Sequence, residues 1–121
     1  MAWLRRERRG SSGAAAEGMA LKYLEGKGLT LVERNFRCRM GEIDLIMRDA
    51  DTLVFVEVRL RGNTAFVSAG ESINHRKQAR IVAAANHYLA GKPEVPCRFD
   101  CILLDKLEPE AIEWIKSAFG A

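Results

Sequence analysis

Two neighbouring segments with strand-like patterns, residues 42–48 and 53–60, constrain the fold more than any other feature of the sequence. Apolar and polar side chains alternate in both, and a polar connector of four residues, 49–52, separates them. A short polar connector between two such segments is typical of an antiparallel hairpin. We therefore expect these two segments to form a β-hairpin.

The register of the hairpin decides where its acidic residues lie. If the connector closes the hairpin, paired residue numbers sum to 101, which sets Asp44 opposite Glu57 and Glu42 opposite Arg59. A slip of one residue would pair Asp44 with Val56 and separate the two carboxylates. Facing carboxylates repel, so a cation, a bound metal ion or full solvation must offset the repulsion. Oxygen ligands suit Mg²⁺ or Mn²⁺ rather than zinc, whereas a bridge from Arg59 or a solvated polar face requires no site.

Outside the hairpin, the sequence predicts helices and further strands on both sides of it. In chain order they are a helix that begins near Ser11 or Ser12 and stops at the glycines 26 and 28, a strand over 29–36, a helix over about 72–90, a strand over 98–104, and a closing helix or strand over 110–119. The expected order is α-β-β-β-α-β plus a tail. This order predicts an α/β fold with a mixed central sheet flanked by helices.

The composition agrees with one small folded domain. The chain has 121 residues, 48% of them hydrophobic, and a disordered chain would contain fewer apolar residues. We expect a flexible basic lead-in over residues 1–12 and a single domain over residues 13–121. The formal net charge is only +3, but residues 1–41 contain nine Lys or Arg against four Asp or Glu. A basic front allows a polyanionic partner without requiring one.

Neither a membrane span nor a secretory signal is expected. Apolar stretches such as residues 53–56 are far shorter than the ~18–20 residues that a spanning helix needs, and the charged start has no apolar run behind it. The cysteines Cys38, Cys97 and Cys101 are odd in number and lack the CxxC spacing, which argues against a disulfide framework or a zinc site. We interpret all three as small buried hydrophobic residues in a reducing, cytoplasmic environment.

Each of the two longer expected helices carries a polar side chain on its apolar stripe. Glu17 is in line with Leu21, and Gln78 is in line with Ile81, at helical spacings. Burying an unpaired carboxylate is costly, so such a position needs an explanation. For each residue alone, the simpler interpretation is a helix-edge side chain that reaches solvent, and for Gln78 we favour it. Together with the hairpin carboxylates, the two residues suggest a convergent polar site.

Several spaced motifs resemble the YraN family of small bacterial proteins. They are GEIDLI at 41–46, VFVEVR at 54–59, KQARI at 77–81 and RFD at 98–100, with RNFR at 34–37 and AF at 118–119. The resemblance spans about residues 13–119. It implies the restriction-endonuclease-like fold, a superfamily that includes Holliday-junction resolvases and whose signature is an Asp followed by Glu-x-Lys on the next strand.

The resemblance implies roles for individual residues. Asp44 and Glu57 match the signature carboxylates and would hold the metal ion, Mg²⁺ or Mn²⁺. Glu17 resembles the glutamate on the first helix of resolvase-like members, a further ligand, and Gln78 resembles a helix glutamine that some relatives use near the site. Arg59 stands where the signature has lysine. An arginine can stabilise charge on a phosphate, but it stays protonated and cannot act as a base.

The implied activity is metal-assisted hydrolysis of phosphodiester bonds in DNA or RNA, directed by structure rather than base sequence. Arg61, Arg76, Lys77 and Arg80 would contact the phosphate backbone, with DNA as the first expectation, although a solvated helix face is the alternative for the helix residues. Lys77 is also a candidate for a second ammonium at the site. The competing hypotheses are a degenerate nucleic-acid-binding protein, in which Arg59 marks lost activity, and a purely structural domain. Many nucleases of this fold act as homodimers, so a homodimer is one expected assembly.

Overall fold

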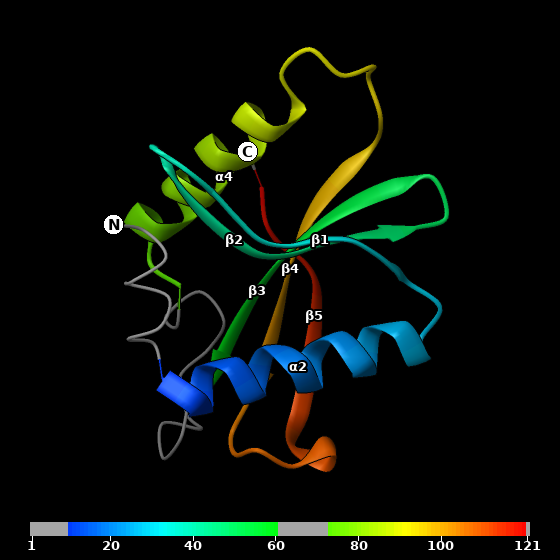
Figure 1. Cartoon of the computed structure of the whole chain (residues 1–121), viewed down its shortest axis with the longest axis vertical. Coiled ribbons are helices and arrows are strands. Elements are labelled where there is room, and N and C mark those ends of the chain that lie inside the picture. The colour runs from blue at the N-terminus through cyan, green and yellow to red at the C-terminus, as the bar shows by residue number, and fades with distance from the viewer. Residues whose placement is uncertain (1–9, 61–72, 121) are drawn as a thin grey trace.

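A five-stranded sheet separates two helices in the computed structural model, which describes residues 10–60 and 73–120 (Figure 1). The elements are α2 (Gly10–Gly26), β1 (Thr30–Cys38), β2 (Gly41–Asp49), β3 (Thr52–Leu60), α4 (His75–Leu89), β4 (Cys97–Leu104), a 3₁₀ turn at Pro109–Ala111 and β5 (Ile112–Phe119). The expected order α-β-β-β-α-β is confirmed. The tail, for which helix and strand were both open, forms a strand.

The sheet is mixed and has the strand order β1-β2-β3-β4-β5. Only the pair β3–β4 is parallel among these neighbours; the other three pairs are antiparallel. Parallel strands need a long crossover connection, and α4 lies in the connection between β3 and β4. The position of the second helix in the sequence therefore explains the mixed sheet.

Each face of the sheet packs against one helix, because apolar side chains alternate along the central strands. In Figure 1, α2 (blue) and α4 (green to yellow) lie on opposite sides of the sheet. The face toward α2 is formed by Leu45, Met47, Val54 and Val56, which pack with Ala16, Ala20 and Leu24. The face toward α4 is formed by Ile46, Leu53 and Phe55, which pack with Ile81, Ala84 and Ala85.

The predicted register of the hairpin is confirmed. Leu45 pairs with Val56 and Arg48 with Leu53, so paired residue numbers sum to 101. The connector is shorter than expected: Asp49 pairs with Thr52, which leaves a turn of two residues rather than four. The first of these, Ala50, has a φ of 54°. Tight two-residue hairpins favour left-handed backbone because it matches the twist of the strands.

Other expectations need correction. Helix α2 begins at Gly10, before the expected serine caps. Only Cys101 is buried among the cysteines, whereas Cys38 is partly buried and Cys97 is exposed, although all three are free thiols. Cys97 is exposed because it is the first residue of β4, before that strand enters the core. The lead-in expected over residues 1–12 lies mostly outside the described residues, so that division stays a prediction.

No helix among the described residues is long and apolar enough to cross a membrane.

Candidate active site at the fork between β2 and β3

The pairing between β2 and β3 ends at Leu45 and Val56, and the two strands separate beyond this pair. The beginning of β2 stays paired with β1, while the end of β3 stays paired with β4. Asp44 on β2 and Glu57 on β3 are the first residues past the last pair. We call this point the strand fork, defined by Asp44, Glu57 and Val58.

The fork is held together by a side chain rather than by the sheet ladder. Asp44 Oδ2 accepts a hydrogen bond of 2.9 Å from the backbone N–H of Val58. A buried backbone N–H needs an acceptor, and β2 no longer offers a carbonyl at this position. One carboxylate oxygen of Asp44 is thus committed to the backbone of β3. The expected pair of Glu42 and Arg59 is absent, because the pairing of β2 with β3 ends at Leu45 and Val56. Glu42 pairs with Arg37 on β1, and the two side chains form an ion pair.

Asp44 and Glu57 are both buried, with exposed fractions of 1% and 4%. Burial raises the pKa of Glu57 to about 8, and the charge of Asp44 adds to the increase. The attraction of Lys77 acts in the opposite direction. The carboxylate pair inferred from the hairpin register therefore exists as an interacting, buried pair.

Lys77 reaches this pair from the second helix. Its Nζ lies 3.1 Å from Glu57 Oε2, and the Lys77 side chain is 39% exposed. The first turn of α4 is fixed by Asn74, whose Oδ1 accepts a hydrogen bond of 2.9 Å from the backbone N–H of Lys77. The Lys77 ammonium therefore contacts a buried carboxylate, while more than a third of its side chain stays exposed to solvent.

Gln78 supports the same helix start. Its Nε2 donates a hydrogen bond of 2.7 Å to the carbonyl oxygen of Ile73, and its backbone N–H bonds to Asn74. Ile73 is fully buried against the sheet. The amide of Gln78 is thus used to fix the entry into α4.

Glu17 and Arg59 lie on different elements, α2 and β3. Glu17 is buried on α2, with 3% exposed, and Arg59 is partly buried on β3, two residues after Glu57. Both side chains take part in further interactions within the protein. The described residues contain no group of three or more His, Cys, Asp or Glu that could hold a metal ion. The role of Glu17 as a further ligand stays a prediction, and Arg61 lies outside the described residues.

A basic pocket of about 340 Å³ lies beside the fork, between the β1–β2 hairpin and the start of α4. Its cationic side chains are Arg37, Arg39, Arg76, Lys77 and Arg80. The sequence indicated the three from the helix but not the two arginines of β1 and its turn. The arginine-rich run at 34–39 was a signal for these two residues, but strand alternation cannot show which of them face a helix that is remote in sequence.

Two of the elements that line this pocket, β2 and α4, are in contact at Gly41. A side-chain carbon added there would lie 2.9 Å from the carbonyl oxygen of Arg80, so only glycine allows α4 to approach β2 this closely. Arg80 Nε also donates a hydrogen bond of 3.3 Å to the carbonyl oxygen of Met40. These two contacts hold the hairpin and the helix at a fixed spacing.

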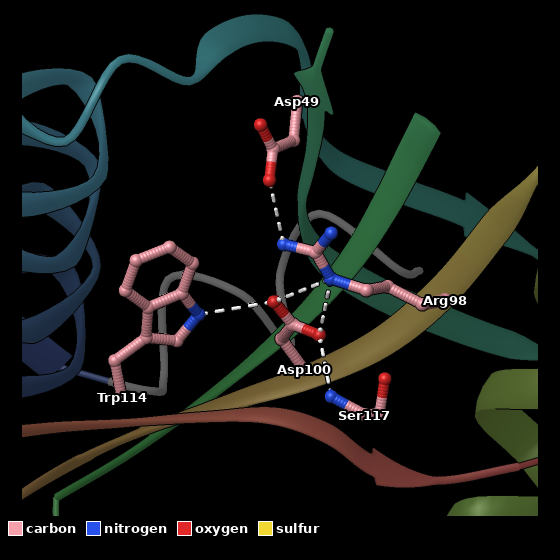
Figure 2. A network of polar contacts seen from close by, with 5 residues as sticks. All are labelled: Asp49, Arg98, Asp100, Trp114 and Ser117. Carbon is pink, nitrogen blue, oxygen red and sulfur yellow. Dashed lines mark hydrogen bonds and ion pairs between the residues drawn. The ribbon is translucent and has the colours of Figure 1, made fainter. Parts of the chain in front are cut away.

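The RFD motif at 98–100 makes contacts within the sheet and not at the strand fork. Figure 2 shows Asp100 between Arg98, Trp114 and Ser117. Asp100 is fully buried and accepts hydrogen bonds from Arg98 Nε at 3.0 Å, Trp114 Nε1 at 3.0 Å and the backbone N–H of Ser117 at 2.9 Å. Arg98 also donates to Asp49 at 3.0 Å. This network joins β4 and β5 to the end of β2.

The element order, the mixed sheet and the flanking helices define the restriction-endonuclease-like class of α/β proteins. A model of the uncharacterised protein family UPF0102, which is the YraN family, matches residues 16–104. A UPF0102 protein of Dechloromonas aromatica is 58% identical over 109 residues, which cover 90% of this chain and 88% of the relative. A UPF0102 protein of Nitrosomonas europaea is 50% identical over 111 residues, which cover 91% and 94%. The chain therefore belongs to the UPF0102 family.

Proposed function

We propose that the protein is a metal-dependent nuclease that hydrolyses phosphodiester bonds, directed by the structure of its nucleic acid rather than by base sequence. The observation that carries this proposal is the buried pair of Asp44 and Glu57 at the strand fork, with Lys77 Nζ 3.1 Å from Glu57. Two carboxylates and an ammonium at one point supply both the metal ligands and the cation of the superfamily signature.

The donor set at the fork fits a hard divalent cation. Mg²⁺ is usually held by one or two carboxylates, with waters and substrate phosphates as the remaining ligands. Asp44 and Glu57 offer carboxylate oxygens, and a cation would offset the burial and the repulsion from Asp44 that together raise the pKa of Glu57. When bound, Mg²⁺ or Mn²⁺ would polarise the scissile phosphate and acidify an attacking water. Glu17 is proposed as an outer ligand, acting through water.

In this proposal, Lys77 and Arg59 together take the roles of the single lysine in the superfamily signature. Arg59, on the strand, would stabilise the charge that builds up on the phosphate in the transition state. Lys77, on the helix, provides a compact ammonium that can orient the attacking water. Gln78 is proposed as a positioning residue, since its bond to Ile73 fixes the turn that carries Lys77.

The proposed substrate is nucleic acid, with DNA first. Arg76 and Arg80 extend the cationic surface from Lys77 along α4, and contacts from such residues to phosphates are independent of base sequence. Cutting both strands of a duplex would need two copies of this site, so a homodimer belongs to the proposal for duplex substrates.

The second candidate function is a degenerate nuclease that binds nucleic acid without cutting it. The presence of Arg59 at the lysine position favours this candidate. Substitution of this one residue separates the two functions, because Arg59→Lys restores the signature.

A cleavage assay on duplex, single-stranded, flap and four-way DNA tests the proposal. Wild-type protein with Mg²⁺ or Mn²⁺ should cleave at least one substrate, Glu57→Ala should not, and Lys77→Met should be slower by about 10²-fold. Cleavage gained only in Arg59→Lys would establish the degenerate form instead. Activity that survives Glu57→Ala would contradict a site at the fork.

Calorimetry tests the metal separately from cleavage. Titration with Mg²⁺ or Mn²⁺ should give binding heat in the wild type that Asp44→Ala abolishes. Asp51→Ala, which removes an exposed carboxylate from the β2–β3 turn, is the matched control and should bind as the wild type does.

A further inference from the structure

We propose that the basic pocket between the β1–β2 hairpin and α4 binds a single phosphate group of a nucleic-acid strand and holds that strand against the strand fork. This proposal rests on the proposed function for the nature of the ligand, but its evidence comes from a different group of residues. The new residues are Arg37 and Arg39, from the hairpin, which complete the pocket together with Arg76 and Arg80 of α4.

The excess of positive charge in the pocket favours the binding of an anion. Five cationic side chains line it, and Glu42 is its only acidic lining residue among those described. Glu42 is already engaged, since its Oε2 lies 3.2 Å from Arg37 Nε. Lys77 is engaged with Glu57. For Arg39 and Arg76, both exposed, the described part of the structure records no ion pair or hydrogen bond.

Arg37 shows that the pocket offers hydrogen bonds as well as charge. Its side chain is 17% exposed, and its Nε and Nη2 donors are buried with no hydrogen-bond acceptor among the described residues. The nearby Glu42 is close enough for an ion pair but not aligned for a hydrogen bond. Buried donors without an acceptor are costly, especially on a charged group. A phosphate oxygen accepts such donors, and arginine matches phosphate with paired N–H groups.

The size and position of the pocket suit one phosphate with its adjoining sugar. A volume of about 340 Å³ is at the small end of the range for ligand pockets, which start at about 300 Å³. Lys77 lines the pocket and also contacts Glu57, so the two sites share one side chain. A phosphate in the pocket therefore lies one side chain away from the carboxylates that would act on the neighbouring linkage.

Binding of short oligonucleotides in EDTA tests the pocket without any cleavage. The test variant is Arg39→Ala with Arg76→Ala, because both side chains are exposed and their loss should not disturb folding. The control is Lys22→Ala with Arg48→Ala, which removes two exposed cations from outside the pocket. Three versions of one strand, with a 5′-phosphate, a 3′-phosphate or neither, distinguish a terminal phosphate from an internal one.

The pocket variant should bind at least about tenfold more weakly than the control, measured by fluorescence anisotropy. The slope of the logarithm of affinity against that of salt concentration should decrease by about 1 for each arginine that contacts a phosphate. A loss confined to one phosphorylated end assigns the pocket to that terminus, and an equal loss for all three strands assigns it to an internal phosphate. Equal affinities and equal salt slopes for the pocket and control variants would overturn the proposal.

The two proposals fail in different ways. If the protein binds through the pocket but no metal ion supports cleavage, the nuclease proposal is wrong and the pocket stands. If cleavage persists in the pocket variant with unchanged affinity, the pocket is wrong and the nuclease proposal stands.

Discussion

Glu57 is a carboxylate in surroundings that favour its neutral form. It is buried beside Asp44, and Lys77 partly offsets the loss of solvation. The sequence placed Glu57 opposite Asp44, but strand alternation could not show that both side chains are enclosed. Enclosure depends on α4, which packs over the fork and brings Lys77 with it.

This burial predicts a pH-dependent stability in metal-free buffer. The pKa of Glu57 rises from 4.5 to about 8 in the folded state, so between these values the folded protein holds a proton that the unfolded chain releases. The contribution of Glu57 to stability is therefore fully present below pH 4.5 and is lost as the pH rises toward 8. Urea unfolding across this range should show a decrease in the wild type relative to Glu57→Gln. Parallel curves for the two proteins would contradict the raised pKa.

At the scale of elements, the spacing between β2 and α4 decides whether the pocket exists. Gly41 is the first residue of β2. A side chain at position 41 would overlap the backbone of Arg80 on α4. The GEIDLI motif thus contains a packing requirement as well as a candidate ligand. Glycine at this position was visible in the sequence, but its partner, almost forty residues later, was not.

Gly41→Ala should destabilise the protein by about 2 kcal/mol, because the added carbon overlaps a backbone oxygen that cannot move without shifting the helix. Gly18→Ala is the control: no atom lies within 4 Å of the added carbon, and an alanine inside α2 should stabilise the protein by about 1 kcal/mol. Chemical denaturation measures both changes. A destabilisation of the same size in the two variants would show that the contact with α4 has no special role.

At the scale of the whole molecule, one sheet is shared by two helical layers, and the Asp100 network joins its distant strands. Asp100 is fully buried, and its bonds reach β5 directly and the end of β2 through Arg98 (Figure 2). Each helix packs into its own core cluster on one face of the sheet, but both clusters are built on side chains of the same three strands, β2, β3 and β4. The described part of the chain should therefore unfold as one cooperative unit.

Asp100→Asn should lower the free energy of unfolding by about 3 kcal/mol, because an amide cannot accept all the hydrogen bonds that the carboxylate accepts and Arg98 loses a charged partner. Circular dichroism and tryptophan fluorescence should report the same shifted midpoint. Asp51→Asn, in the exposed turn, should leave the midpoint unchanged. Separate transitions by the two probes would show that the sheet does not couple the layers.

The sequence by itself determined the hairpin, its register and the element order, because side-chain alternation and turn chemistry act between near neighbours. The sequence also identified Asp44 and Glu57, since the register places them at matching positions on two neighbouring strands. Tertiary structure alone decided the ion pair of Lys77 with Glu57, the inclusion of Arg37 in the pocket and the partners of Asp100. These contacts join elements that are remote in sequence, and they depend on how closely each helix or strand packs. Local sequence patterns therefore cannot predict how closely two remote elements pack.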